Sequence, residues 1–120
     1  MAGKVLLIED EPHIAEAIRF ILARDGWSVA SHASGDGAVQ AVRREAPDAI
    51  VLDVMLPGRS GFDILADLRA DPATAGLPVL MVSANGRERQ RAEEAGAARF
   101  ISKPFANSEI VSALRDVAGG

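Results

Sequence analysis

The stretch VLLIEDEP, residues 5–12, places four large apolar residues directly before three acids and a proline. A short, continuous apolar run is typical of a strand that is covered on both faces of a parallel sheet. Pro12 suits the first position of a helix, and apolar residues recur at helical spacing from Ile14 to Leu22. The stretch therefore predicts a strand, an acidic loop and a helix in succession.

The same alternation continues along the chain and predicts five strand–helix units. Right-handed crossovers between such units give a parallel sheet with helices on both faces, an α/β doubly wound (βα)5 fold. We expect one domain over residues 1–120, with its core at about 4–117. The expected strands are 5–8, 27–33, 49–52, 79–82 and 100–102, and the expected helices are 12–25, 38–45, 62–70, 87–95 and 109–117.

Composition narrows the class of protein. The 120 residues contain no cysteine, which excludes disulfides and thiolate metal sites. The net charge of -4 argues against direct binding of nucleic acid. No apolar run approaches the roughly 20 residues that span a bilayer, and the N-terminus lacks the pattern of a signal peptide. We therefore expect a cytoplasmic protein that does not contact membranes.

Chemically active side chains follow four of the five expected strands. Glu9 and Asp10 follow the first, Asp53 the third, Ser83 the fourth and Lys103 the fifth. Each alone also fits a helix cap or a solvated loop residue. In an open α/β sheet, however, the carboxyl ends of the strands share one crevice, where ligands bind. Three carboxylates there require positive charge, which Lys103 and a bound Mg²⁺ ion would supply.

Four segments carry a more specific signal: IEDEP (8–12), IVLDVMLPGRSGFD (50–63), LMVSA (80–84) and FISKPF (100–105). In this order and at these intervals, the chain resembles the receiver domain of bacterial two-component response regulators over essentially its whole length. The resemblance implies a flavodoxin-like fold with strand order 2-1-3-4-5.

The resemblance also implies which residues bind metal and phosphate. Asp53 would be the phosphoacceptor, a nucleophilic carboxylate that forms an acyl phosphate. Asp10 would bind Mg²⁺ directly, and Glu9 would bind it directly or through water. The backbone carbonyl of Met55 would be a further ligand. Mn²⁺ is an alternative metal for the same oxygen ligands.

Further residues would contact the phosphoryl group and respond to it. Lys103, the Ser83 hydroxyl and the backbone N–H of Ala84 would bind its oxygens. Phe100 would be an aromatic switch residue that turns inward as Ser83 moves toward the phosphate. Pro104 would follow a cis peptide bond.

The implied function is a phosphorelay. A phosphohistidine on a sensor histidine kinase or a phosphotransfer protein would donate the phosphoryl group. The charge added at Asp53 would then reshape an outer face, formed by residues 87–95, 100–102 and 109–117, for a downstream protein target. The chain would act as a switch with at most weak self-phosphorylation and self-dephosphorylation. Met55 offers no group to orient water, which favours a long-lived phosphoryl form.

Two departures from the family pattern concern dimer formation. Ala98 and Arg99 precede the switch aromatic where many DNA-binding regulators carry acids, and Ala113 stands where an arginine is expected. Glu109 is kept. We therefore expect a monomer or a weak, phosphorylation-dependent dimer, and favour a stand-alone receiver over a fragment of a longer regulator.

Two other functions fit the topology less well. A phosphohydrolase of the haloacid dehalogenase type needs a second acid two residues after its nucleophile, where this chain has Met55. A nucleotide- or flavin-binding module needs a Gly- or Ser-rich loop after the first strand, where this chain has Glu9, Asp10 and Glu11.

Overall fold

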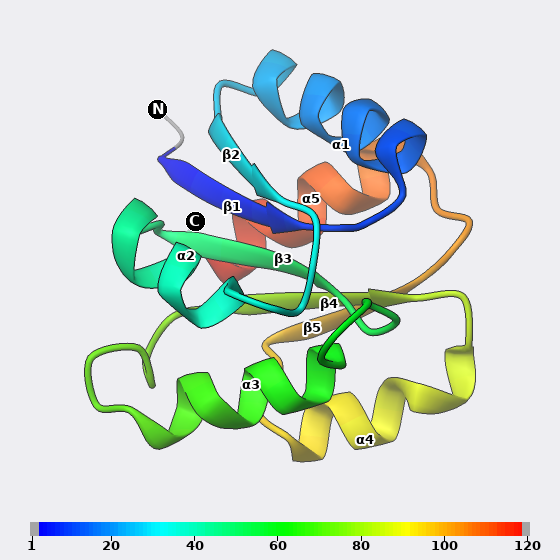
Figure 1. The fold of residues 1–120 in the computed structure, drawn as a ribbon. Coiled ribbons are helices and arrows are strands. Elements are labelled where there is room, and N and C mark those ends of the chain that lie inside the picture. Colours follow the sequence, from blue (N-terminus) through cyan, green and yellow to red (C-terminus); the bar gives the residue numbers. More distant parts are fainter. Residues whose placement is uncertain (1–2, 119–120) are drawn as a thin grey trace.

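The computed structural model describes residues 3–118, in which strands and helices alternate along the chain (Figure 1). The strands are β1 (Lys4–Ile8), β2 (Ser28–His32), β3 (Ala49–Asp53), β4 (Val79–Ser83) and β5 (Arg99–Ser102). The helices are α1 (Pro12–Arg24), α2 (Ala38–Glu45), α3 (Gly61–Ala70), α4 (Arg89–Glu94) and α5 (Asn107–Val117).

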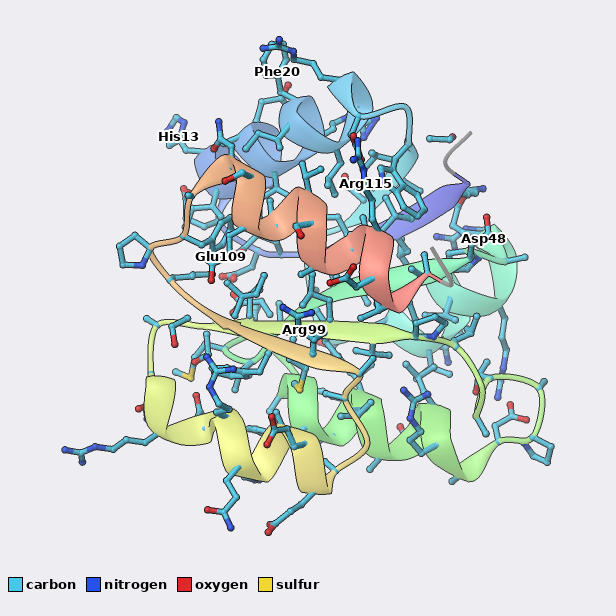
Figure 2. All side chains as sticks on the ribbon, turned by 180° about the vertical axis from the view of Figure 1, so that it is seen from behind. His13, Phe20, Asp48, Arg99, Glu109 and Arg115 are labelled. Atoms are coloured by element: carbon cyan, nitrogen blue, oxygen red, sulfur yellow. The ribbon has the colours of Figure 1, made fainter. Side chains whose placement is uncertain are left out.

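All five strands lie in one parallel sheet of order β2-β1-β3-β4-β5. The expected fold class and strand order are confirmed. Helices α1 and α5 cover one face of the sheet, and α2, α3 and α4 cover the other (Figure 1). Viewed from behind, Arg115 of α5 lies against α1, where it forms an ion pair with Asp25 (Figure 2).

Successive side chains of each strand enter different cores, because a strand alternates its side chains between the two faces of a sheet. The core under α1 and α5 receives Val5, Leu7, Ala49, Val51, Leu80, Val82 and Ile101. The core under α2, α3 and α4 receives Leu6, Ile8, Ile50, Leu52, Val79, Met81 and Phe100. Because both faces are buried there, β1, β3 and β4 carry continuous apolar runs, as the sequence pattern indicated.

Most expected elements begin and end within two residues of those in the structure, and the helix expected at 87–95 differs most. The strand expected at 27–33 is limited to Ser28–His32. The helix expected at 87–95 is divided into a 3-10 turn, η1 (Gly86–Glu88), and the helix α4. The turn begins where the Asn85 side chain accepts a hydrogen bond from the N–H of Arg87. Such a local cap tightens the first turn, and periodicity of apolar residues does not reveal it.

The junction between β3 and α3 fixes the chain directly after Asp53. The N–H of Gly61 donates to the carbonyl of Val54 over 2.8 Å. Ser60 and Asp63 form a capping box at the start of α3. A Cβ atom added at Gly61 would overlap the backbone carbonyl of Asp53. A residue without a side chain is therefore required where α3 meets the end of β3.

Replacement of Gly61 by alanine should lower the free energy of unfolding by about 1–3 kcal/mol, the usual cost of overpacking. The backbone at Asp53 would have to shift, because the atoms that the new methyl group meets are main-chain atoms. Urea unfolding measures the change. Gly76→Ala is the matched control, since nothing lies within 4 Å of a Cβ atom added there. Equal stability of the two variants would contradict the assigned close packing.

Candidate functional site

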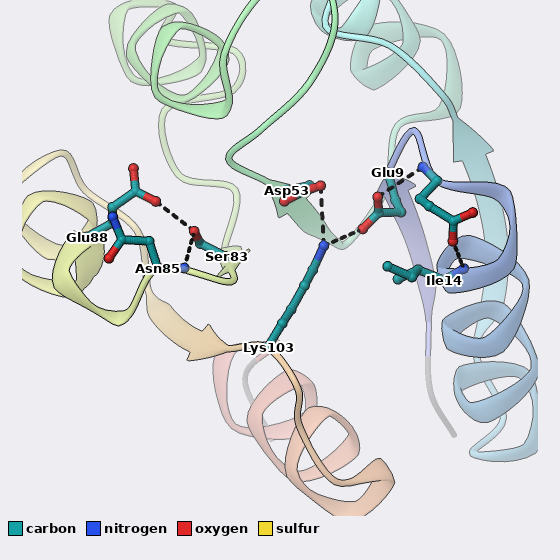
Figure 3. A network of polar contacts seen from close by, with 8 residues as sticks. Glu9, Ile14, Asp53, Ser83, Asn85, Glu88 and Lys103 are labelled. Atoms are coloured by element: carbon teal, nitrogen blue, oxygen red, sulfur yellow. Dashed lines mark hydrogen bonds and ion pairs between the residues drawn. The ribbon is translucent and has the colours of Figure 1, made fainter.

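Three charged side chains meet at the carboxyl edge of the sheet. The Lys103 ammonium lies 2.8 Å from Glu9 Oε1 and 3.3 Å from Asp53 Oδ2 (Figure 3). The convergence follows from the alternation along the strands: Glu9 is two residues after Leu7, Asp53 two after Val51 and Lys103 two after Ile101, all on the α1–α5 face. The structure therefore brings Glu9 and Asp53 together around the Lys103 ammonium.

Backbone hydrogen bonds extend the sheet beyond these strand ends and hold the site in place. The N–H of Glu9 donates to the carbonyl of His32 over 3.1 Å. The N–H of Lys103 donates to the carbonyl of Ser83 over 2.8 Å. The bond between Lys103 and Pro104 is cis, the conformation that the family resemblance implied.

Burial sets the electrostatics of the cluster. Glu9 and Asp53 are each only 4% exposed. Burial, together with the charge of Glu9 and against the attraction of Lys103, raises the pKa of Asp53 to about 6. Burial acts to lower the pKa of Lys103, but its hydrogen bond to Glu9 and the charges of both acids leave that pKa above its ordinary value. The ammonium group is therefore charged and partly offsets the repulsion between the acids.

The acids also form a group that suits a divalent cation. Glu9, Asp10 and Asp53 each offer one carboxylate oxygen, and the three oxygens lie within 4.8 Å of one another. Hard cations with a preference for oxygen ligands, Mg²⁺ above all, fit such a donor set. Met55, two residues beyond Asp53, has an exposed side chain, and the role expected for its backbone carbonyl stays a prediction.

Ser83 does not join this cluster in the structure. Its hydroxyl donates to Glu88 Oε1 over 2.6 Å and accepts from the N–H of Asn85 over 3.1 Å. Figure 3 shows the hydroxyl turned toward Glu88, away from Asp53. The serine lies two residues after Met81 on β4 and so belongs to the same face, which α4 covers. Ala84, the next residue, is exposed.

Phe100 is 3% exposed and packs in the core under α4. The Arg89 guanidinium lies over its ring, 5.1 Å from the centroid, and donates to its backbone carbonyl over 3.1 Å. The sequence reasoning coupled the inward turn of Phe100 to movement of Ser83 toward the phosphate. In the structure Phe100 is buried while Ser83 donates to Glu88, so burial of the ring does not require Ser83 to face Asp53.

The contacts of Glu88 with Ser83 and of Arg89 with Phe100 were not predicted from the sequence. Glu88 and Arg89 lie on the short segment that follows β4, and both contact residues that were named as switch residues. The sequence does hold a signal for these contacts. Side chains alternate along β4 and β5, and this alternation places Ser83 and Phe100 on the face of the sheet that the segment after β4 covers.

The family model of the response regulator receiver domain matches residues 5–115. The chain belongs to this family. Receiver domains act in two-component signalling, so phosphorelay signalling is the function of this domain, and the hydrolase and nucleotide-binding alternatives are not favoured.

Individual relatives agree with the assignment. The chain is 41% identical over 113 residues to TcrX of Mycobacterium tuberculosis, covering 92% of this chain and 47% of TcrX. It is 37% identical over 119 residues to the phosphate regulon transcriptional regulatory protein PhoB of Escherichia coli, covering 98% of this chain and 52% of PhoB. The receiver domain thus spans about half the length of these curated relatives.

A solved structure resembles the receiver domain over both full chains. Superposition on the receiver domain of the sensor histidine kinase PA1611 from Pseudomonas aeruginosa gives a TM-score of 0.90 with 29% sequence identity, and it covers 100% of each chain. That structure has a magnesium ion coordinated in its active-site cleft. Within residues 3–118 of the present chain, no helix is long and apolar enough to cross a membrane.

Asp53→Asn should stabilise the metal-free domain at neutral pH, because it removes a buried charge beside Glu9. The pKa of Asp53 rises from an ordinary 3.8 to about 6 on folding. At about 1.4 kcal/mol per pKa unit, the expected gain in the free energy of unfolding is about 2–3 kcal/mol. The gain should be largest above pH 6 and should shrink as the pH falls, until it vanishes below the ordinary pKa of 3.8, where the carboxyl is protonated in both states.

Urea unfolding of both proteins across this pH range, with a chelator present, measures the gain. Asp116→Asn, which neutralises an exposed carboxylate, is the control and should change stability little. A gain for Asp53→Asn that did not depend on pH would show that charge repulsion is not its source.

Proposed function

We propose that Asp53 is the phosphoacceptor of this receiver domain. The observation that supports this role most directly is the shared contact of the Lys103 ammonium with Asp53 and Glu9 at the carboxyl edge of the sheet. A carboxylate so placed has an oxygen available for in-line attack and a cation beside it to stabilise charge on the transferred group. The domain would act as a signalling switch, with self-phosphorylation and self-dephosphorylation at most weak.

Glu9, Asp10, Asp53 and the backbone carbonyl of Met55 would hold Mg²⁺, and the same oxygens would accept Mn²⁺. The bound metal would neutralise charge on the phosphoryl oxygens during transfer. The three clustered carboxylates support this ligand set. Because Lys103 already contacts Glu9, metal and lysine would divide the carboxylate oxygens between them.

The remaining phosphoryl oxygens would be bound by Lys103, the Ser83 hydroxyl and the backbone N–H of Ala84. Ser83 and Phe100 would form the switch. Since the Phe100 ring is buried in the structure, phosphorylation would act on it by stabilising this inward position. The change would be passed to the outer face formed by α4, β5 and α5.

The partners proposed are a sensor histidine kinase or a phosphotransfer protein as donor, and a downstream protein that binds this outer face. We expect no direct contact with nucleic acid by this chain, whose net charge is -4. Ala113, at the position expected to carry a dimer-forming arginine, is fully buried. This burial favours a monomer or a weak dimer. Residues 1–120 would form one receiver domain in the cytoplasm; its outermost residues lie outside the described range.

Incubation with acetyl phosphate and Mg²⁺ should add one phosphoryl group to the domain, as measured by the mass of the intact protein. Asp53→Ala should abolish the addition, because the carboxylate nucleophile is lost. Asp67→Asn, which changes an exposed carboxylate on α3, should be phosphorylated normally. A phosphoryl group that persisted in Asp53→Ala would place the acceptor elsewhere.

Lys103→Ala should still bind Mg²⁺, because all three carboxylates remain, but phosphorylation should no longer alter the outer face. Titration with Mg²⁺ and NMR spectra of the backbone amides of α4, β5 and α5, with and without a phosphodonor, separate the two effects. Lys4→Ala, which removes a lysine at the start of β1 that pairs with Glu45 of α2, is the control. Normal spectral changes in Lys103→Ala would remove Lys103 from the switch.

A further inference from the structure

We propose that Glu88 is a positioning residue that holds the Ser83 hydroxyl away from Asp53 and competes with the phosphoryl group for it. The proposal rests on the phosphoacceptor role of Asp53. It adds a residue that sets how readily the switch responds.

The contact between Ser83 and Glu88 has the features of a strong hydrogen bond. The two oxygens lie 2.6 Å apart, and Ser83 is 1% exposed. The acceptor is a carboxylate, and bonds to charged acceptors are shorter and roughly twice as strong as neutral ones. Burial of the serine keeps water from taking the place of Glu88. The bond therefore has a substantial effect on where the hydroxyl points.

The hydroxyl has a single proton to donate. It cannot be given to Glu88 and to a phosphoryl oxygen at the same time. Formation of the bond proposed for the phosphorylated state must therefore break the bond to Glu88. The Ser83–Glu88 bond therefore lowers the affinity of the site for a phosphoryl group, because this bond has to be broken before the new one forms.

The position of Glu88 couples this competition to the second switch residue. Arg89, the next residue along the chain, contacts the Phe100 ring and donates to its carbonyl. Glu88 ends η1 and Arg89 begins α4. One short segment thus contacts both switch residues, and release of Ser83 from Glu88 frees the segment that holds Phe100.

Binding of beryllofluoride, a mimic of a carboxyl-bound phosphoryl group, tests the proposal when titrated calorimetrically in Mg²⁺ buffer. Glu88→Ala should bind beryllofluoride about tenfold more tightly than the unchanged protein, the effect of losing one hydrogen bond to a charged group. Glu88→Gln should give a smaller gain, because its neutral amide oxygen still accepts a weaker bond. Circular dichroism checks that each variant is folded.

Two controls separate positioning from the removal of negative charge. Glu93→Ala removes the same charge from an exposed position on α4 and should leave the affinity unchanged. In a Ser83→Ala background, Glu88→Ala should have no effect, because no hydroxyl remains to be released. This pair of measurements is a double-mutant cycle for the Ser83–Glu88 bond.

The results that would overturn the proposal are distinct. If Glu88→Ala binds beryllofluoride with unchanged affinity, Glu88 does not compete for the Ser83 hydroxyl. The role proposed for Asp53 would still stand in that case, because the unchanged protein binds beryllofluoride. An equal gain in Glu93→Ala, or in the Ser83→Ala background, would assign the effect to charge alone. Failure of the unchanged protein to bind beryllofluoride would overturn the proposed function and this inference with it.

Discussion

Two buried carboxylates that share one ammonium group are the constraint on which the site depends. Glu9 and Asp53 repel each other in a poorly solvated position, and Lys103 compensates only in part, as the raised pKa of Asp53 indicates. The three side chains come from the ends of β1 and β3 and from just after β5, so the arrangement exists only once the whole sheet has formed. The repulsion between the two acids lowers the stability of the fold, so selection for stability alone would not favour this cluster. Destabilising arrangements of this kind are characteristic of functional sites.

The alternation of side chains along the strands divides the site into two parts. The charged cluster lies on the α1–α5 side of the sheet, whereas Ser83 and Phe100 lie on the side of α4. Glu88 and Arg89 hold the second pair from the helix side. Asp53 pairs in register with Val82, the residue before Ser83, so the end of β4 lies between the two parts of the site.

Much of this organisation could be predicted from the sequence, for identifiable reasons. Continuous apolar runs located the strands, and the rule that parallel strands end at one edge of the sheet predicted that Glu9, Asp53 and Lys103 lie close together. The direction of the Ser83 hydroxyl could not be predicted. It depends on a 3-10 turn capped by Asn85, a local hydrogen bond that places Glu88 within reach and leaves no trace in the pattern of apolar residues.

Contacts within the chain stabilise the outer face formed by α4, β5 and α5. On β5, Arg99 pairs with Asp116 of α5 over 3.1 Å, and the carbonyl of Phe100 accepts from Arg89. The Arg99–Asp116 pair is exposed, so it constrains α5 only weakly. The contacts of Arg89, by contrast, involve a buried ring and a backbone carbonyl. A change passed to this face as proposed would therefore meet less resistance at α5 than at the start of α4, and the segment around Glu88 and Arg89 would set its threshold.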